Sequence, residues 1–218
     1  MQYDGLVCNE GPLVYAQKKT IFATEKDSER VQGLRAHHEK RQESLKREKL
    51  IFIDESGHRL GATNRYGWAI RGEKAIGSEP HGDWKTMTMI GAMSATSVRA
   101  FMTIDAPTDK DVFSAFVTSM LLPQIKKGDI VVMDNLGAHK NGATIREIQK
   151  AGAEVLFLPP YSPDLNPIEK LWSKLKEFIR RCETNTRELF EAAVNLALQN
   201  ITRDDLKGWI TDCGYRIN

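Results

Sequence analysis

Two short apolar runs in this sequence each end in an aspartate. Residues 50–53 lead directly into Asp54, and residues 130–133 lead directly into Asp134. Uninterrupted apolar runs of this length are typical of buried strands, and reactive groups in open α/β sheets gather where such strands end. A third acid, Glu169, comes at the start of a helical pattern that a proline-pinned loop connects to the next strand. We expect the three carboxylates to share one site at a sheet edge.

Three ionised carboxylates a few ångströms apart repel one another and raise one another's pKa unless a cation lies between them. Ligation by oxygen alone favours Mg²⁺ or Mn²⁺ over zinc. Two such ions about 3.5 to 4 Å apart lower the pKa of an attacking water or hydroxyl and stabilise the leaving oxygen of a phosphodiester. The residues therefore predict a metal-dependent nuclease or strand-transfer site, in which Asp54, Asp134 and Glu169 are both the metal ligands and the catalytic residues.

Each acid also has a purely structural interpretation. An aspartate after a strand is commonly a turn or helix-cap residue, which would account for Asp54 or Asp134 taken alone. Glu169 stands three residues after Asn166, the spacing of a capping box, with Pro167 at the first helical position. Spacing alone does not separate the structural roles from the catalytic ones.

Other polar side chains near these acids are candidates for supporting roles. Asn135 and His139 follow Asp134 closely and could orient a ligand water or a phosphate, or make hydrogen bonds within their loop. Trp172 lies on an apolar stripe, and we assign it to the core. Basic residues along the helix after Glu169 would suit a DNA backbone or a solvated face; they are Lys170, Lys174, Lys176, Arg180 and Arg181.

The remaining patterns predict a mixed sheet with helices on its faces. Strands are expected at 67–72, 84–95 and 98–104, with turn-sized gaps typical of an antiparallel meander, and at 155–158. Helices are expected from an N-cap at Thr108 to about residue 121, over 142–151, from Asn166 onward and from about Thr186. The last of these is expected to bury Leu189, Phe190, Ala193, Val194 and Ala197.

The first 49 residues differ in character from the rest. Residues 1–24 show no sustained period, and residues 24–49 are rich in charge, with Val31, Leu34, His38 and Leu45 as sparse candidates for one helical face. We expect a leader or linker that contains a mostly solvated helix. A DNA-tracking arm is the weaker alternative, because glutamates are interspersed among its lysines and arginines.

Composition excludes several classes of protein. The chain has 218 residues, of which 41% are hydrophobic, so it can build a real core and is not mainly disordered. It has neither an apolar run long enough to cross a membrane nor a secretory signal at its start, so we expect a cytoplasmic protein, which would associate with the nucleoid only when bound to DNA. The net charge of +2 is too even to indicate a nucleic-acid partner by itself. Cys8, Cys182 and Cys213 are widely spaced and read as ordinary thiols.

Four segments together resemble a known family. They are residues 52–57, 80–86, 131–140 and 158–169, and the last is long and specific. They are similar to the bacterial insertion-sequence transposases related to eukaryotic mariner elements (the insertion sequence six-thirty family). Between Asp134 and Glu169 lie 34 residues, the separation typical of this branch of DDE transposases, and the resemblance runs from about Lys18 to Tyr215.

The resemblance implies a ribonuclease H-like catalytic domain over residues 50–218, an α/β fold with a mixed five-stranded sheet and helices on both faces. It implies that Asp54, Asp134 and Glu169 form the acidic triad with Mg²⁺ or Mn²⁺. The implied reaction is cleavage of double-stranded DNA at element ends, followed by attack of the freed 3′ hydroxyl on target DNA, commonly at a TA step. A homodimer is expected by analogy, and the N-terminal helix-turn-helix module of the family is expected to be missing or truncated.

Two other functions remain open from the sequence. A host nuclease of the same fold, acting on an RNA–DNA hybrid or a four-way junction, would need similar acids but would not explain the block at 158–169. An inactive DNA-binding remnant of a transposase would keep the block without the activity.

Overall fold

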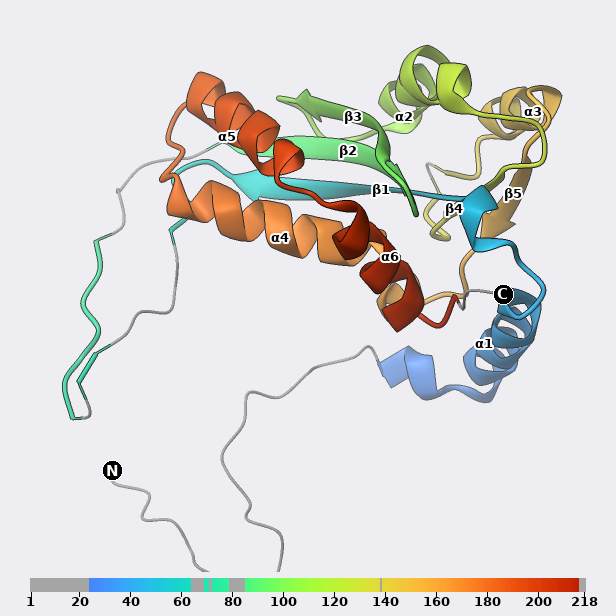
Figure 1. The fold of residues 1–218 in the computed structure, drawn as a ribbon, viewed down its shortest axis with the longest axis horizontal. Coiled ribbons are helices and arrows are strands. Elements are labelled where there is room, and N and C mark those ends of the chain that lie inside the picture. The colour runs from blue at the N-terminus through green and yellow to red at the C-terminus, as the bar shows by residue number, and fades with distance from the viewer. Residues whose placement is uncertain (1–23, 64–68, 71, 79–84, 138, 216–218) are drawn as a thin grey trace, which may run out of the picture.

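The structure, a computed structural model, describes residues 24–63, 69–70, 72–78, 85–137 and 139–215. Within them, five strands form one mixed sheet in the order β3-β2-β1-β4-β5 (Figure 1). The strands β1, β2 and β3 make the antiparallel meander, and β4 and β5 continue the sheet parallel to β1. Their bounds are Leu50–Arg59 (β1), Thr86–Ser94 (β2), Val98–Ile104 (β3), Ile130–Met133 (β4) and Glu154–Phe157 (β5).

Helices cover both faces of this sheet, as the sequence predicts. Side chains alternate along β1, so that Leu50 and Phe52 enter one core while Ile51 and Ile53 enter the other. The first core lies under α4, α5 and α6, and the second lies under α2 and α3. The helices are α1 (Glu29–Gln42), α2 (Lys110–Phe116), α3 (Gly142–Lys150), α4 (Ile168–Arg181), α5 (Arg187–Gln199) and α6 (Arg203–Asp212).

Several boundaries differ from the predicted ones. The strand β1 continues six residues past Ile53 because its far half pairs with β2. The cap of α2 is Asp109 rather than Thr108, since its carboxylate accepts hydrogen bonds from the backbone N–H groups of Asp111 and Val112. After α2 the chain continues as a π-helical turn, Val117–Leu121. Half of the strand expected at 67–72 lies outside the described residues, and residues 69, 70 and 72 are not in a strand.

Two predicted core positions are wrong. Leu189 is 51% exposed because the buried face of α5 begins one residue later, at Phe190. Leu34 is likewise exposed, because α1 turns Val31, His38 and Gln42 inward instead. The stripe predicted on α4 is confirmed, with Trp172 in the core.

The sequence-based prediction misses α6 altogether. The signal is present at its start, where Thr202 and Asp205 form a capping box with reciprocal hydrogen bonds. Leu206 and Ile210 then pack into the first core. None of the helices in the described part of the chain has both the length and the apolar character that a bilayer crossing requires.

Candidate active site

The three predicted acids line one pocket. Asp54 ends the buried half of β1, Asp134 directly follows β4, and Glu169 lies in the first turn of α4. All three border a cavity of about 500 Å³, whose wall is completed by Asn135, by the loop at 158–166 and by Arg30 of α1. The parallel pairing of β1 with β4 brings Asp54 and Asp134 to the same sheet edge, as the sequence predicts.

Asp54 is the most buried of the three acids, at 6% exposure. Trp172 Nε1 donates a hydrogen bond to its Oδ2 atom at 3.2 Å, and Asn166 Nδ2 donates to the same oxygen at 3.4 Å. Burial and the charge of Glu169, with a smaller contribution from Asp134, raise the pKa of Asp54 to about 7. The hydrogen bonds from Trp172 and Asn166 therefore do not offset the negative charge that the three carboxylates bring into the pocket.

A glycine allows Trp172 to reach Asp54. Gly91 of β2 is the cross-strand neighbour of Asp54. A Cβ atom at this position would lie 2.8 Å from the Cη2 atom of the Trp172 indole and 3.3 Å from a ring carbon of Phe101. The absence of a side chain at Gly91 thus lets the indole lie against the strand, with its N–H group directed at Asp54.

We expect Gly91→Ala to destabilise the fold by about 1 to 3 kcal/mol, because the added methyl group overpacks the Trp172 ring. The measurement is the free energy of unfolding in urea. Gly33→Ala in α1 is the matched control, since its Cβ meets nothing within 4 Å and should stabilise the helix by up to about 1 kcal/mol. Equal stability of Gly91→Ala and the unsubstituted protein would show that the indole has room to move.

A buried histidine holds Asp134 from behind the pocket. His139 is fully buried, with its Nδ1 atom 2.5 Å from Asp134 Oδ1 and its Nε2 atom 2.8 Å from Glu55 Oε2. Burial would lower the pKa of His139, but the adjacent carboxylates of Asp134 and Glu55 raise it to about 10. The imidazolium also packs on the Phe113 ring, with centroids 4.3 Å apart. His139 thus contacts carboxylates rather than the pocket itself, while Asn135 is exposed at the pocket wall.

Glu169 does not form the capping box that its spacing allows. No side chain caps the start of α4, and the Asn166 side chain turns instead toward Asp54. Asn166 Oδ1 is buried and has no hydrogen-bond partner in the described part of the chain. Partial burial of the Glu169 carboxylate and the charge of Asp134 raise its pKa, whereas the nearby Lys176 opposes this shift. The structural interpretation of Glu169 therefore loses its basis.

The basic residues predicted on α4 divide between two faces. Lys170 and Lys174 make ion pairs with Asp212 and Asp205 of α6, at 2.7 and 2.6 Å. Lys176 lies on the side of the acids, where burial lowers its pKa and the charges of Glu169 and Asp54 raise it. Arg180 follows one turn later on the face of Lys176. Arg181 pairs with Glu177 on the surface, so Lys176 and Arg180 are the predicted basic residues nearest the acids.

Sequence reasoning misses several residues at this site. Glu55 reaches the site through His139, the Trp172 N–H group contacts Asp54 from α4, and Arg30 comes from a helix that precedes the sheet. Among the described residues, no group of three or more histidine, cysteine, aspartate or glutamate side chains is already drawn together tightly enough to hold a metal ion. The three acids share the pocket in an open arrangement.

Several known proteins with similar sequences or folds are transposases. The family described as DDE superfamily endonuclease matches residues 49–190. The Tcb2 transposase of Caenorhabditis briggsae is 27% identical over 176 residues, which are 75% of this chain and 63% of that protein. This chain therefore spans less than two thirds of the length of that relative.

Solved structures share the fold at low sequence identity. The mariner Mos1 transposase in its paired-end complex with Mg is 13% identical, with a TM-score of 0.76 over 92% of this chain and 64% of that one. The isolated catalytic domain of Mos1 is also 13% identical, with a TM-score of 0.67 over 92% of this chain and 93% of that one. The ribonuclease H-like fold expected from the sequence is confirmed.

Proposed function

Because the chain belongs to the DDE superfamily of endonucleases, we propose that it is the catalytic part of a transposase that cleaves and rejoins DNA strands. One observation carries this proposal. Three carboxylates from β1, the end of β4 and α4 line a single pocket, and their mutual repulsion together with burial raises the pKa of Asp54 to about 7. Such a site favours a divalent cation.

We propose Asp54, Asp134 and Glu169 as the ligands of that cation, Mg²⁺ or Mn²⁺, and two ions in the active complex. The three proposed ligands are all carboxylates, and Asn166, whose buried Oδ1 atom has no hydrogen-bond partner among the described residues, lines the same pocket. When bound, the cation would activate the attacking water or hydroxyl and stabilise the leaving oxygen of the phosphodiester.

The surrounding residues orient these carboxylates. Trp172 and Asn166 both bind Oδ2 of Asp54, which fixes the rotation of the carboxylate and leaves Oδ1 without either donor. His139 holds Oδ1 of Asp134 and is itself held by Glu55. Supporting residues of this kind contribute about 10- to 100-fold to metal affinity or activity.

Positive charge marks a path for the DNA backbone. Lys176 lies near Glu169 and Asp54, Arg180 follows on the same face of α4, and Arg30 borders the pocket from α1. We propose that these residues bind phosphates on either side of the cleaved bond. By analogy with the paired-end complex of Mos1, two copies of this chain would hold two DNA ends. We place the catalytic domain at residues 50–218, and the 34-residue spacing from Asp134 to Glu169 supports the bacterial insertion-sequence branch.

The test is cleavage of defined substrates by the purified chain in Mn²⁺ or Mg²⁺. Supercoiled plasmid and linear duplex should be nicked, and chelation with EDTA should stop the reaction. Cleavage of an RNA–DNA hybrid or a four-way junction alone would contradict the transposase proposal and favour a host nuclease. Absence of any cleavage would favour an inactive remnant.

Glu169→Gln provides the matching variant. We expect it to abolish cleavage without lowering the melting temperature, because no capping interaction is lost and the repulsion between Glu169 and Asp54 is relieved. A large loss of stability with cleavage retained would assign Glu169 a structural role. Lys150→Gln, on the outer surface of α3, serves as the control for a change in exposed charge.

A further inference from the structure

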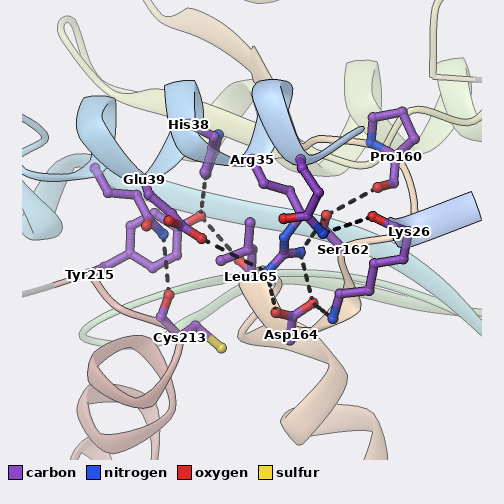
Figure 2. A network of polar contacts seen from close by, with 12 residues as sticks. Lys26, Arg35, His38, Glu39, Pro160, Ser162, Asp164, Leu165, Cys213 and Tyr215 are labelled. Atoms are coloured by element: carbon purple, nitrogen blue, oxygen red, sulfur yellow. Dashed lines mark hydrogen bonds and ion pairs between the residues drawn. The ribbon is translucent and has the colours of Figure 1, made fainter. Parts of the chain in front are cut away.

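The helix α1 takes part in the candidate active site although it precedes the family match, which begins at residue 49. Arg30, in its first turn, lines the pocket that contains Asp54. Further along the helix, Arg35 points at the loop at 158–166, which forms another wall of that pocket (Figure 2). The helix α1 is therefore in direct contact with the candidate active site.

Arg35 binds this loop through three hydrogen bonds. Its Nη1 atom donates to Ser162 Oγ at 2.7 Å and to Asp164 Oδ1 at 3.1 Å, and its Nη2 atom donates to Asp164 Oδ2 at 2.6 Å (Figure 2). We call Arg35, Ser162 and Asp164 the Arg35 clamp. A two-pronged pairing of this geometry is among the stronger polar contacts in proteins. Exposed ion pairs contribute little, but the Arg35 side chain is only 11% exposed.

A second series of hydrogen bonds connects α1 to the same loop through Tyr215. Tyr215 Oη donates to the carbonyl oxygen of Leu165 at 3.0 Å, and it lies 3.2 Å from His38 Nε2. Because the phenol has one hydrogen and the carbonyl can only accept, His38 must donate from Nε2. Arg35 and His38 are three residues apart, so both lie on the same face of α1. Contacts with Arg35 and Tyr215 therefore hold the loop at residues 162, 164 and 165.

The backbone of the loop contains a strained residue that contacts from outside the loop must stabilise. Tyr161 has a φ of 55°, which lies in the left-handed region. A residue other than glycine is strained there and keeps this conformation only when its surroundings hold it. Ser162, the next residue, donates to the carbonyl oxygen of Pro160 while it accepts from Arg35. The strained residue is therefore bridged by a hydrogen bond that the Arg35 clamp holds in place.

We propose that Arg35 is a positioning residue for the active site, which keeps the loop at 158–166 in the conformation that directs Asn166 and Glu169 toward Asp54. Asn166 is two residues beyond Asp164, and it donates to Asp54 Oδ2. Release of Asp164 would free the loop to relax at Tyr161 and withdraw Asn166. The activity arm of the test rests on the proposed function, whereas the contacts in the loop do not.

Arg35→Ala tests the proposal, with Arg41→Ala as the matched control. Arg41 belongs to the same helix and makes an ion pair with Glu154, which begins β5 at the end of the strand away from the loop. We expect Arg35→Ala to speed hydrogen exchange at the amides of Leu165 and Asn166 and to raise the Mn²⁺ concentration for half-maximal plasmid nicking, each by about 10-fold or more. The kcat for nicking should fall while the KM for DNA changes little, and Arg41→Ala should leave all these quantities unchanged.

Two further variants make the result decisive. Asp164→Asn removes the charge from the loop side and should reproduce the effects even if Arg35→Ala does not fold. The exchanged pair Arg35→Asp with Asp164→Arg should recover part of the protection from exchange. Unchanged exchange at Leu165 and Asn166 in Arg35→Ala, or equal losses in Arg41→Ala, would overturn the proposal. A wild-type chain that never nicks DNA would refute the proposed function alone, because hydrogen exchange would still report on the clamp.

Discussion

Asp54→Asn is expected to abolish metal-dependent DNA cleavage and, in the same protein, to raise the melting temperature measured without metal. Cleavage should fall by at least about 100- to 1000-fold, the range seen when one group that stabilises a transition state is removed. The stability gain arises because the buried Asp54 carboxylate faces the charges of Glu169 and Asp134, and asparagine keeps an oxygen for the Trp172 N–H group. A rise of roughly 3 °C or more at pH 8 corresponds to about 1 kcal/mol.

The gain should depend on pH in a defined direction. Asp54 has a pKa of about 7 in the folded chain against 3.8 as its ordinary value, so the folded state binds the proton more tightly. The stabilisation by protonated Asp54 is complete below about pH 4 and is lost as the pH rises through 7. The melting temperatures of the two proteins should therefore converge in acid and separate above neutrality. Mn²⁺ should raise the melting temperature of the unsubstituted protein only, and equal curves at all pH values would contradict the account.

His139→Ala is expected to give the largest loss of stability, about 3 to 5 kcal/mol, because it leaves two carboxylates near a buried space without their shared cation. His139 is fully buried between Asp134 and Glu55. The free energy of unfolding in urea measures this loss. Cleavage should also fall, since Asp134 loses the contact that orients it.

A double variant separates the two effects. His139→Leu combined with Glu55→Leu replaces the buried pair by apolar groups and should recover much of the stability. Cleavage should stay reduced by about 10- to 100-fold, because Asp134, the proposed metal ligand, loses the residue that orients it. Recovery of both stability and cleavage would mean that His139 serves the fold only.

The meeting of the three acids was predictable because it depends on strand order. Apolar runs ending in Asp54 and Asp134 need only parallel pairing to bring the two side chains together, and β1 and β4 pair in this way. The proline-pinned loop then limits where Glu169 can lie. The five-stranded mixed sheet followed from the resemblance, and the structural matches bear it out.

The neighbours of the acids were not predictable because they depend on register and side-chain direction. Gly91 faces Asp54 through a pairing that no local pattern encodes. Glu55 and His139 are 84 residues apart, and their contact arises only when the loop after β4 folds back on β1. The capping-box alternative shows the same limit: the spacing from Asn166 to Glu169 fits a cap, but Asn166 makes a longer-range contact with Asp54.

The packing of α1 against the loop at 158–166 affects the choice of boundaries for an expressed fragment. A fragment starting at residue 49, where the family match begins, would retain every acid of the pocket yet leave Ser162 and Asp164 without Arg35. It would also expose Tyr215, which is buried in the intact chain. Inhibitor screens or crystals based on such a fragment would contain the loop at 158–166 without the contacts that hold its conformation. Expression boundaries should therefore be set ahead of Thr24.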